Sequence, residues 1–339
     1  MKNIQKKLGF FKNDVTNDVG MEERLLAILR LAIKYSATDI HFLLKGVSIS
    51  IEMRINNEMR RLKTKYNDDK LIRYLQYLAN LDLGKQLEPQ TGHFEMKVDE
   101  TNLSLRFAVI NGYNYCNAVL RILNHNLNFS PDSLSLIKEQ NDFFKEILQR
   151  KNGLIVFSGP TGSGKTTTLY TLLKSRRGAK IYTIEDPVEI YCDDFIQLQI
   201  NEAIGFDYEA GIKQLLRHDP DIIMIGEIRD SKAAKMAVVA ANTGHLVLTT
   251  IHSSSAASAI TRLIELGVDK GHLYEVLISI SNQRMLFNTE TSKKQVFYET
   301  MDEKEIKYLK EYGKNSNKFV SLHNQIGKAN KDGIFAEVK

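Results

Sequence analysis

The stretch FSGPTGSGKTTTLY, residues 157–170, decides the fold, because it carries the pattern G-x-x-x-x-G-K-[ST] between a predicted strand and a predicted helix. Glycines at these positions let backbone N–H groups curl around phosphate oxygens, and the N-terminus of the following helix adds partial positive charge. We therefore predict a nucleotide-binding loop here. The residues predicted to bind the nucleotide are Gly159, Pro160, Thr161, Gly162, Ser163, Gly164, Lys165, Thr166 and Thr167.

Short apolar runs recur on both sides of this loop and predict the sheet that carries it. The runs are LIVFSG (154–159), KIYTIE (180–185), IIMIGE (222–227) and HLVLTT (245–250). Segments of helical length separate them. Continuous apolar strands that alternate with helices are typical of a parallel sheet covered on both faces. The sequence thus predicts an α/β domain over residues 134–290, which begins with a helix in LSLIKEQNDFFKEILQRK.

The N-terminal part has a different pattern. MEERLLAILRLAIKYS (21–36) has an apolar stripe at helical spacing, whereas VSISIEMRI, NLSLRFAVI and YCNAVLRIL alternate as half-buried strands do. Asn56-Asn57 tolerates positive φ and is expected to close a hairpin. We predict a small α+β domain on an antiparallel sheet over residues 20–125. The other predicted segments are a flexible N-terminus (1–19), a linker (126–133) and a helical, polar C-terminal tail (291–339).

Composition excludes several classes of protein. The net charge of +5, from 46 basic and 41 acidic residues, is too small for a protein that coats nucleic acid. Cys116 and Cys192 are too few for a disulfide framework or a zinc site, and they fit a reducing cytosol. No apolar run approaches the length of a membrane-spanning helix, and the N-terminus lacks the features of a secretory signal. Membrane association is expected to go through a partner or the surface.

Three further segments place acids and histidines at predicted strand ends, where α/β nucleoside triphosphatases keep their chemistry. TIEDPVE ends a strand with Glu185, RHDPDIIMIGEIRD ends another with Glu227, and TGHLVLTTIHSSSA has His245 and His252 at the two ends of a third. Each alone has an ordinary alternative, because an acid at a strand end is often a helix cap and a single histidine is often a core residue. With the phosphate loop before them, they make four segments in a fixed order, which is a much rarer coincidence.

Together these segments resemble the hexameric secretion ATPases of type II secretion, type IV pili and competence pseudopili. The matching segments are the Walker A box (159–166), the Asp box (185–189), the atypical Walker B box (226–230) and the His box (244–254). The resemblance extends more weakly into the first domain, where SATDIHF resembles that domain's signature, and LRFAV and VLRIL resemble segments with two arginines. It implies a RecA-like P-loop ATPase domain preceded by a small PAS-like domain.

The motif and the resemblance assign roles to particular residues. Lys165 is predicted to bind the β- and γ-phosphates of ATP, and Thr166 to bind Mg²⁺. Glu185 is the candidate for polarising the attacking water, and Glu227 is expected near Mg²⁺ or that water, a choice that the sequence leaves open. The resemblance implies that His252 senses the γ-phosphate. It also implies that two arginines of the first domain contact this phosphate and couple hydrolysis to domain rotation; the alternative for them is a surface salt bridge. These arginines are Arg106 and Arg121.

Three departures from the family pattern matter. Assembly ATPases often carry a tetracysteine zinc loop, but NQRMLFNTETSKKQVFYE (282–299) contains no cysteine, so no zinc is expected. His93 in TGHF stands where the family has an arginine. Residues 1–19 are too short to form the additional first domain of the long pilus-assembly ATPases. Small size without a zinc loop resembles the DNA-uptake ATPases of Gram-positive bacteria.

The predicted function is therefore an ATP-hydrolysing motor that drives assembly of a competence or type IV-like pseudopilus for DNA uptake. The resemblance implies a cytoplasmic homohexamer, peripherally bound to the membrane through a polytopic inner-membrane platform protein. A retraction motor is an alternative, although no segment of the AIRNLI type is found. A RecA-like nucleic-acid motor would need a basic groove with stacking aromatic residues, and the chain has no tryptophan, so direct nucleic-acid binding is not expected. A non-enzymatic scaffold is a further alternative.

Overall fold

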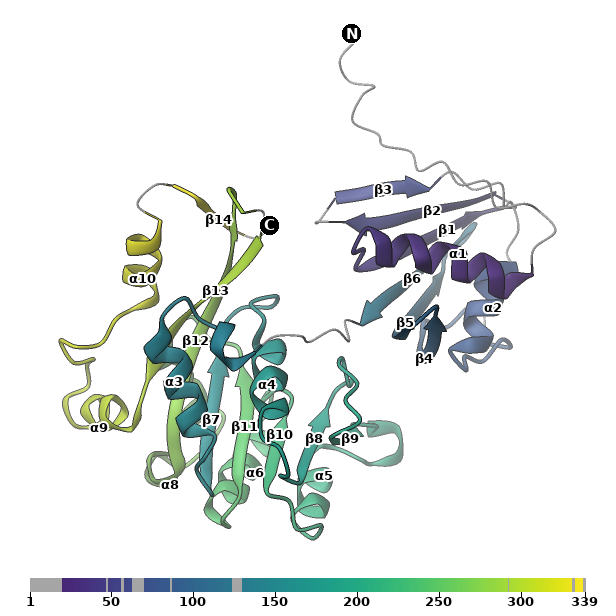
Figure 1. Cartoon of the computed structure of the whole chain (residues 1–339). Helices are drawn as coiled ribbons and strands as arrows, with labels where there is room; N and C mark the ends of the chain where they lie inside the picture. Colours follow the sequence, from purple (N-terminus) through teal and green to yellow (C-terminus); the bar gives the residue numbers. More distant parts are fainter. Residues whose placement is uncertain are drawn as a thin grey trace. The chain divides into compact units, whose positions relative to one another are not determined.

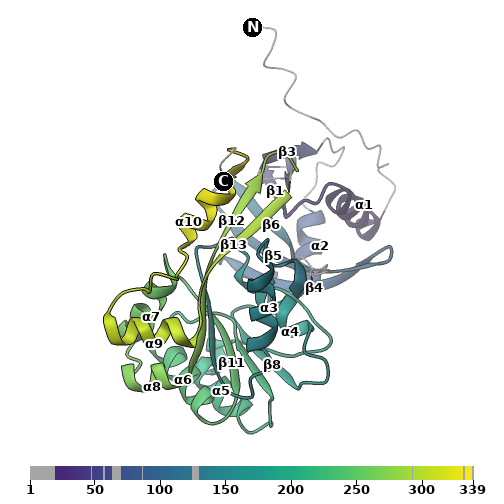
Figure 2. The same ribbon diagram turned by 60° about the vertical axis from the view of Figure 1, so that its left-hand side comes forward.

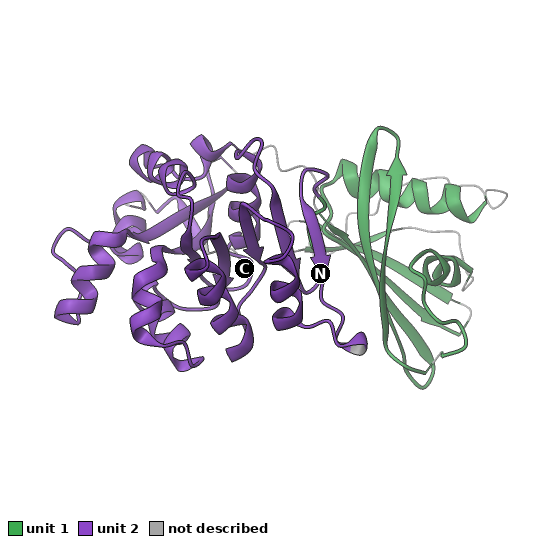
Figure 3. Ribbon diagram, turned by 90° about the horizontal axis from the view of Figure 1, so that it is seen from below, with its two compact units in different colours: residues 1–126, 189–191 green, residues 127–188, 192–339 purple. Residues whose placement is uncertain are grey.

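The chain forms two compact units in a computed structural model (Figures 1 and 3). Unit 1 comprises residues 1–126 and 189–191, and unit 2 comprises residues 127–188 and 192–339. The structure describes residues 20–46, 48–55, 58–62, 70–85, 87–123, 130–291, 293–330 and 333–337. Each unit has its own hydrophobic core. No helix within these ranges has the length and apolar character needed to cross a membrane.

Unit 1 is an antiparallel sheet with two helices. Its elements are α1 (Met21–Lys34), β1 (Asp39–Lys45), β2 (Ser48–Ile55), β3 (Glu58–Leu62), α2 (Lys70–Leu78), β4 (Gln90–Val98), β5 (Thr101–Asn111) and β6 (Tyr115–Leu123). The strand order is β3-β2-β1-β6-β5-β4, and every adjacent pair is antiparallel. Alternate strand residues, such as Ile51 and Leu105, pack with Leu25 and Leu29 of α1, which leaves the opposite face of the sheet polar.

Two predictions for the N-terminal part are not tested by the described residues. The hairpin turn at Asn56-Asn57 and the flexible segment 1–19 lie outside them. The likeness of unit 1 to a PAS domain stays a prediction. What the structure does establish is the alternation of buried and exposed residues along β2, β5 and β6, which follows from one face packing on the helices.

Unit 2 contains an eight-stranded sheet, counted over the described residues. Its strands are β7 (Gly153–Ser158), β8 (Ile181–Glu185), β9 (Ile196–Gln199), β10 (Ile222–Ile225), β11 (Leu246–Ile251), β12 (Leu277–Asn288), β13 (Lys293–Met301) and β14 (Phe335–Glu337). The order is β13-β12-β7-β11-β10-β8-β9, with β14 also paired to β12. All pairs from β12 to β9 are parallel, while β13 and β14 run antiparallel to β12. The predicted parallel sheet is confirmed.

Helices cover both faces of this sheet (Figure 2). α3 (Lys138–Ile147) and α4 (Lys165–Lys174) lie on one face, where Phe144 packs on Phe157 and Tyr298. The other face carries α5 (Tyr208–Leu215), α6 (Ser231–Asn242), α7 (Ala256–Glu265), α8 (Lys270–Val276) and α9 (Glu303–Tyr312), which share one apolar core with the sheet. α10 (Leu322–Ala329) packs against β12 and β13. Every residue of β7, β8, β10 and β11 is buried, as their apolar sequences require.

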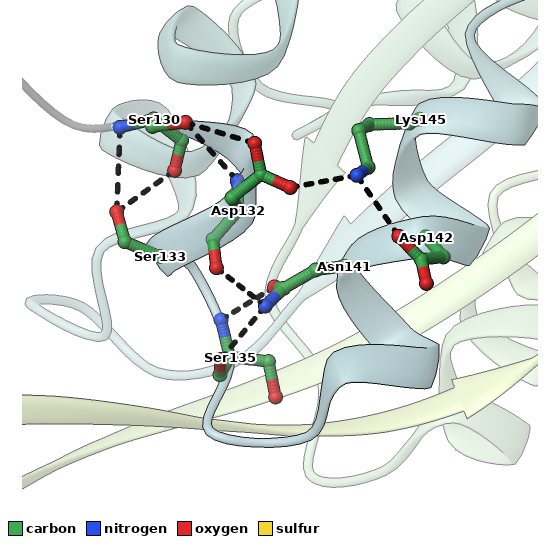
Figure 4. A network of polar contacts seen from close by, with 7 residues as sticks. All are labelled: Ser130, Asp132, Ser133, Ser135, Asn141, Asp142 and Lys145. Carbon is green, nitrogen blue, oxygen red and sulfur yellow. Dashed lines mark hydrogen bonds and ion pairs between the residues drawn. The ribbon is translucent and has the colours of Figure 1, made fainter.

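The start of unit 2 is fixed by a polar network (Figure 4). Residues 126–129 of the predicted linker lie outside the described residues, but Pro131–Ser133 form a short 3₁₀ helix with a capping box at Ser130. The buried amide of Asn141 on α3 donates to the carbonyls of Asp132 and Ser135, at 2.8 and 2.9 Å, and accepts from the Ser135 N–H. The last residues of the predicted linker are therefore bonded to α3 of unit 2.

The segment expected to be a helical, polar tail, residues 291–339, departs from that description at its beginning. β13 extends the main sheet, and Tyr298 and Met301 on it are fully buried. The reason is tertiary, because β13 pairs with nine residues of β12 and is covered by α7, α9 and α10. The charged composition that suggested a solvated helix belongs to α9, which follows the strand.

Candidate active site

The loop between β7 and α4 has a backbone that its glycines make possible. Gly159, Gly162 and Gly164 have φ values of 141°, 78° and 88°, a range that side chains rarely allow. A Cβ at Gly159 would lie 2.4 Å from the backbone oxygen of Gln283, so the loop also approaches β12 too closely for any other residue. The local sequence thus produces a tight loop that leads into the N-terminus of α4, the kind of backbone arrangement that binds phosphate groups.

Lys165 begins α4, and its ammonium group lies within the loop. Its Nζ donates to the carbonyl oxygens of Gly159, at 2.8 Å, and Pro160, at 3.1 Å. The residue is only 8% exposed. A buried cation at a helix N-terminus fits a phosphate group, which offers stronger acceptors than backbone carbonyls. Thr166 follows in the same first turn of α4.

Glu227, just beyond β10, is joined to the phosphate loop by His252, just beyond β11. The Nε2 atom of His252 lies 2.9 Å from Oε1 of Glu227, and its Nδ1 lies 3.1 Å from the carbonyl oxygen of Gly159. Oε2 of Glu227 accepts from Nε of Arg229 at 2.9 Å. Arg229 also pairs with Asp186 at 3.2 Å. Four segments that are far apart in the sequence, which contain Gly159, Asp186, Glu227 and His252, therefore form one bonded cluster.

Glu185 ends the neighbouring strand β8 and is almost completely buried, with 3% exposure. Its Oε1 accepts hydrogen bonds of 2.6 Å from the hydroxyls of Tyr170 and Thr183. Burial raises the pKa of the Tyr170 phenol, and the negative charge of Glu185 raises it further, so this hydroxyl stays a donor. Gly226, which directly precedes Glu227, lies close to Glu185: a Cβ at Gly226 would lie only 3.0 Å from Cγ of Glu185.

Two amides of β12 support the cluster from the other side. Nδ2 of Asn282 donates to Oγ of Ser158 at 3.0 Å and to the carbonyl of Ser253 at 3.1 Å. Nε2 of Gln283 donates to the carbonyl of Ser163 at 2.7 Å. Both side chains are fully buried. Sequence reasoning missed these roles, although two consecutive amides that directly follow the β-type alternation of apolar residues and serines in LISIS (277–281) are a usable signal.

In unit 1, the predicted arginines lie on the polar face of the sheet. Strand pairing places His93, Arg106, Arg121, Asp39 and Arg54 opposite one another, in that order, across five strands. Nε of Arg121 donates to Oδ1 of Asp39 at 2.7 Å. Burial opposes ionisation of Asp39, but the hydrogen bonds from Arg121 and Thr38 outweigh it, so the pKa of this carboxyl lies below its ordinary value. Among the residues that the structure describes, Arg106 has no hydrogen-bond or ion-pair partner.

Comparison with known proteins identifies the family. The family described as "Type II/IV secretion system protein" matches residues 15–327. The chain belongs to this family. It is 38% identical over 255 residues to the competence protein ComGA of Bacillus subtilis, an alignment that covers 74% of this chain and 72% of that protein. It is 37% identical over 265 residues to the putative type II secretion system protein E of Escherichia coli, covering 77% of this chain and 54% of that protein.

Among solved structures, the chain is similar to the pilus retraction motor PilT, crystallised with bound ADP. The TM-score is 0.70 and the sequence identity 25%, over 91% of this chain and 89% of that one. An 18% identical structure, the ATPase DotB of Legionella pneumophila, has the same TM-score and supports the fold. The predicted family and the RecA-like P-loop fold are confirmed.

For this member of the secretion-system family, the structure brings part of the predicted site together. The loop residues, Lys165, Glu185, Glu227 and His252 all lie where β7, β8, β10 and β11 end in unit 2. Arg106 and Arg121 belong to unit 1. His245 lies at the opposite end of β11 from His252, with Nδ1 3.2 Å from the carbonyl of Ala240, and takes no part in the cluster.

Proposed function

We propose that this chain is an ATP-hydrolysing motor that drives assembly of a competence or type IV-like pseudopilus needed for DNA uptake. The observation that carries the proposal is the bonded cluster of Gly159, His252 and Glu227, in a chain 38% identical to a competence protein. A phosphate loop alone fits many nucleotide-binding proteins. Here His252 also connects the loop to the ends of β10 and β11, so loss of the γ-phosphate can alter the positions of Glu227 and His252.

The residues divide the work of phosphoryl transfer as follows. Loop N–H groups and Lys165 bind the β- and γ-phosphates, and the hydroxyl of Thr166 together with Glu227 offers oxygen ligands to Mg²⁺. Bound Mg²⁺ would neutralise phosphate charge. Glu185 orients the attacking water, because the Tyr170 and Thr183 hydroxyls fix its carboxylate at the adjacent strand end. We propose ATP and Mg²⁺ as cofactors and no zinc.

The arginines of unit 1 are proposed to complete this site and to couple it to movement. Arg106 is the stronger candidate, because Arg121 is already bonded to Asp39 in unit 1. An arginine supplied to the γ-phosphate can raise the rate by about 10³–10⁵. Loss of that phosphate would remove the contact, so nucleotide state would set the angle between two rigid bodies.

The proposed setting follows from the family. We propose a homohexamer at the cytoplasmic face of the membrane, bound to a polytopic platform protein, with no direct contact to nucleic acid. Native mass measurement with and without ATP tests the ring. We propose residues 20–125 as the first domain and residues 134–290, extended by β13, as the core of the ATPase domain.

Lys165→Ala tests the enzymatic part of the proposal. We expect ATP turnover to fall to background, because the variant loses the cation that meets the phosphates. Arg106→Ala should spare ATP binding and suppress turnover. Arg121→Ala is its matched control, and we expect it to lower turnover less and to remove the ion pair with Asp39. Normal hydrolysis by Arg106→Ala would remove the proposed coupling contact.

A deletion strain tests the biological part. Cells that lack the gene should lose surface pili and DNA uptake, and complementation with Lys165→Ala should restore neither. The similarity to PilT favours one alternative, a retraction motor. That alternative predicts an excess of surface pili in the deletion strain, so the count of pili separates the two.

A further inference from the structure

Glu299 is a buried carboxylate that connects two helices. It lies on β13 and is 6% exposed. Its Oε1 accepts from the backbone N–H of Ala256, the first residue of α7, at 2.8 Å. Its Oε2 accepts from the backbone N–H of Leu322, the first residue of α10, at 2.9 Å. A carboxylate suits both places, because the first N–H groups of a helix lack partners within the helix and carry partial positive charge.

The first of these helices begins directly after the His box. His252 lies four residues before Ala256, and Ser255 between them is the N-cap of α7. The position of the first residue of α7 therefore determines the position of the preceding residues 252–255. His252 holds Gly159 of the phosphate loop and Glu227, so its position depends on that start.

A second contact points to the same segment. In the pairing of β12 with β13, Asn282 lies directly opposite Glu299, and residues opposite each other share a face of the sheet. Asn282 bonds the carbonyl of Ser253, while Glu299 bonds the N–H of Ala256. Two neighbouring side chains of the β12–β13 pair, here called the C-terminal hairpin, thus hold Ser253, at the end of the His box, and Ala256, which follows it.

We propose that Glu299 is a positioning residue for ATP hydrolysis: it sets the start of α7 and thereby holds His252 against the phosphate loop and Glu227. Its two carboxylate oxygens bond helix N–H groups, so the proposed effect on hydrolysis acts through His252. The second carboxylate oxygen of Glu299 bonds the start of α10, so the position of His252 also depends on α10. The C-terminal segment thereby supports the active site. This inference rests on the proposed ATPase function.

Glu299→Gln in the full-length protein tests the inference. The amide keeps the shape of the side chain but has one acceptor oxygen, so one helix N–H loses its partner. We expect kcat for ATP to fall about tenfold to a hundredfold, with KM within about threefold, because small misplacements of a site cost rate. Hydrogen exchange of the amides in residues 253–258 should become faster.

Glu305→Gln is the matched control. Glu305 is also a carboxylate of the C-terminal segment, and it accepts from the N–H and the hydroxyl of Ser316. It has no bond to α7 among the described residues. We expect this control to leave kcat and the exchange of residues 253–258 as in the parent, even where it lowers the melting temperature.

If Glu299→Gln does not fold, the double variant Glu299→Ala/Ala256→Pro is used instead. Proline has no N–H and is favoured at the first position of a helix, and the extended Ser255 (φ −151°, ψ 167°) is compatible with a following proline. We expect it to recover kcat and exchange protection relative to Glu299→Ala alone.

The outcomes separate this inference from the proposed function. Unchanged exchange at residues 253–258 in both Glu299→Gln and Glu299→Ala, the second of which removes both acceptor oxygens, overturns the inference whether or not ATP is hydrolysed. Faster exchange with unchanged kcat, or equal loss of kcat in Glu299→Gln and Glu305→Gln, also overturns it. A parent protein without ATPase activity defeats the proposed function, while the exchange measurement still decides whether Glu299 sets the start of α7.

Discussion

The ends of strands β8 and β10 carry two glutamates that are neighbours in space and opposite in environment. Glu185 is 3% exposed and its carboxylate accepts from two hydroxyl groups. The Glu227 side chain is 19% exposed and lies between Arg229 and His252. One acid is fixed inside the protein, and the other faces the phosphate loop among charged groups.

This difference suggests different chemical tasks. A carboxylate held rigidly by hydroxyl donors is suited to orienting a water molecule, since its direction cannot change. A partly exposed carboxylate beside the phosphate loop is suited to a metal ion, which needs oxygen ligands that a nucleotide can approach. The sequence placed both acids at strand ends and left the choice between them open.

Glu185→Gln is expected to have the largest effect. Removal of a general base costs about 10²–10⁴ in rate, and we expect turnover to fall about 10³-fold while ATP binding persists. The checks are steady-state ATPase rates and equilibrium binding of a fluorescent ATP analogue. Turnover above a tenth of the parent rate would give the task of orienting water to another residue.

Glu227→Gln is expected to come next, with turnover about 10²-fold lower at saturating Mg²⁺ and a higher Mg²⁺ concentration for half-maximal activity, because one anionic oxygen near the ion is lost. A Mg²⁺ titration of the ATPase rate measures this. If Glu185→Gln shifts the Mg²⁺ requirement and Glu227→Gln does not, the two assignments must be exchanged.

Tyr170→Phe sharpens the comparison, because it removes one of the two hydroxyls that fix Glu185. We expect turnover to fall about tenfold and the free energy of unfolding to fall by about 1–3 kcal/mol. Tyr298→Phe is the matched control, since its buried hydroxyl bonds Thr168 at 2.9 Å instead. It should lose similar stability and less activity; equal losses of activity would mean that orientation of Glu185 is not the cause.

Arg229→Ala is expected to have the smallest effect. Its side chain is 56% exposed, and exposed ion pairs are worth about 0–1 kcal/mol, so we expect turnover within about threefold of the parent and little change in melting temperature. Lys213→Ala, which breaks the exposed pair with Glu209 on α5, is the control. A loss as large as that of Glu227→Gln would show that Arg229 is needed to place Glu227.

Much of unit 2 could be predicted because its signals are local. The G-x-x-x-x-G-K-[ST] pattern requires glycine at positive φ and a lysine at a helix start, and both are found at Gly159, Gly164 and Lys165. Strands buried on both faces must be apolar throughout, which made β7, β8, β10 and β11 visible as runs. The acids follow these strands directly, so their placement at one edge of the sheet came with the topology.

The contacts that hold the phosphate loop, Glu227 and His252 together could not be predicted from local sequence patterns. Glu299 is 43 residues from Ala256, and Asn282 is 124 residues from Ser158, so no local spacing relates them. β13 was assigned to the polar tail because charged residues follow it, and its membership of the sheet depends on pairing with β12. Long-range pairing of this kind is decided by which surfaces bury one another.

The sequence by itself therefore determined the phosphate loop, the parallel strands around it and the acids at their ends, because backbone geometry and hydrophobic period are properties of short segments. Only the tertiary structure decided which carboxylate is buried, which amides hold the loop, and that the C-terminal hairpin reaches the His box. Burial and hydrogen bonding between distant segments exist only after the chain has folded, and these are what separate Glu185 from Glu227.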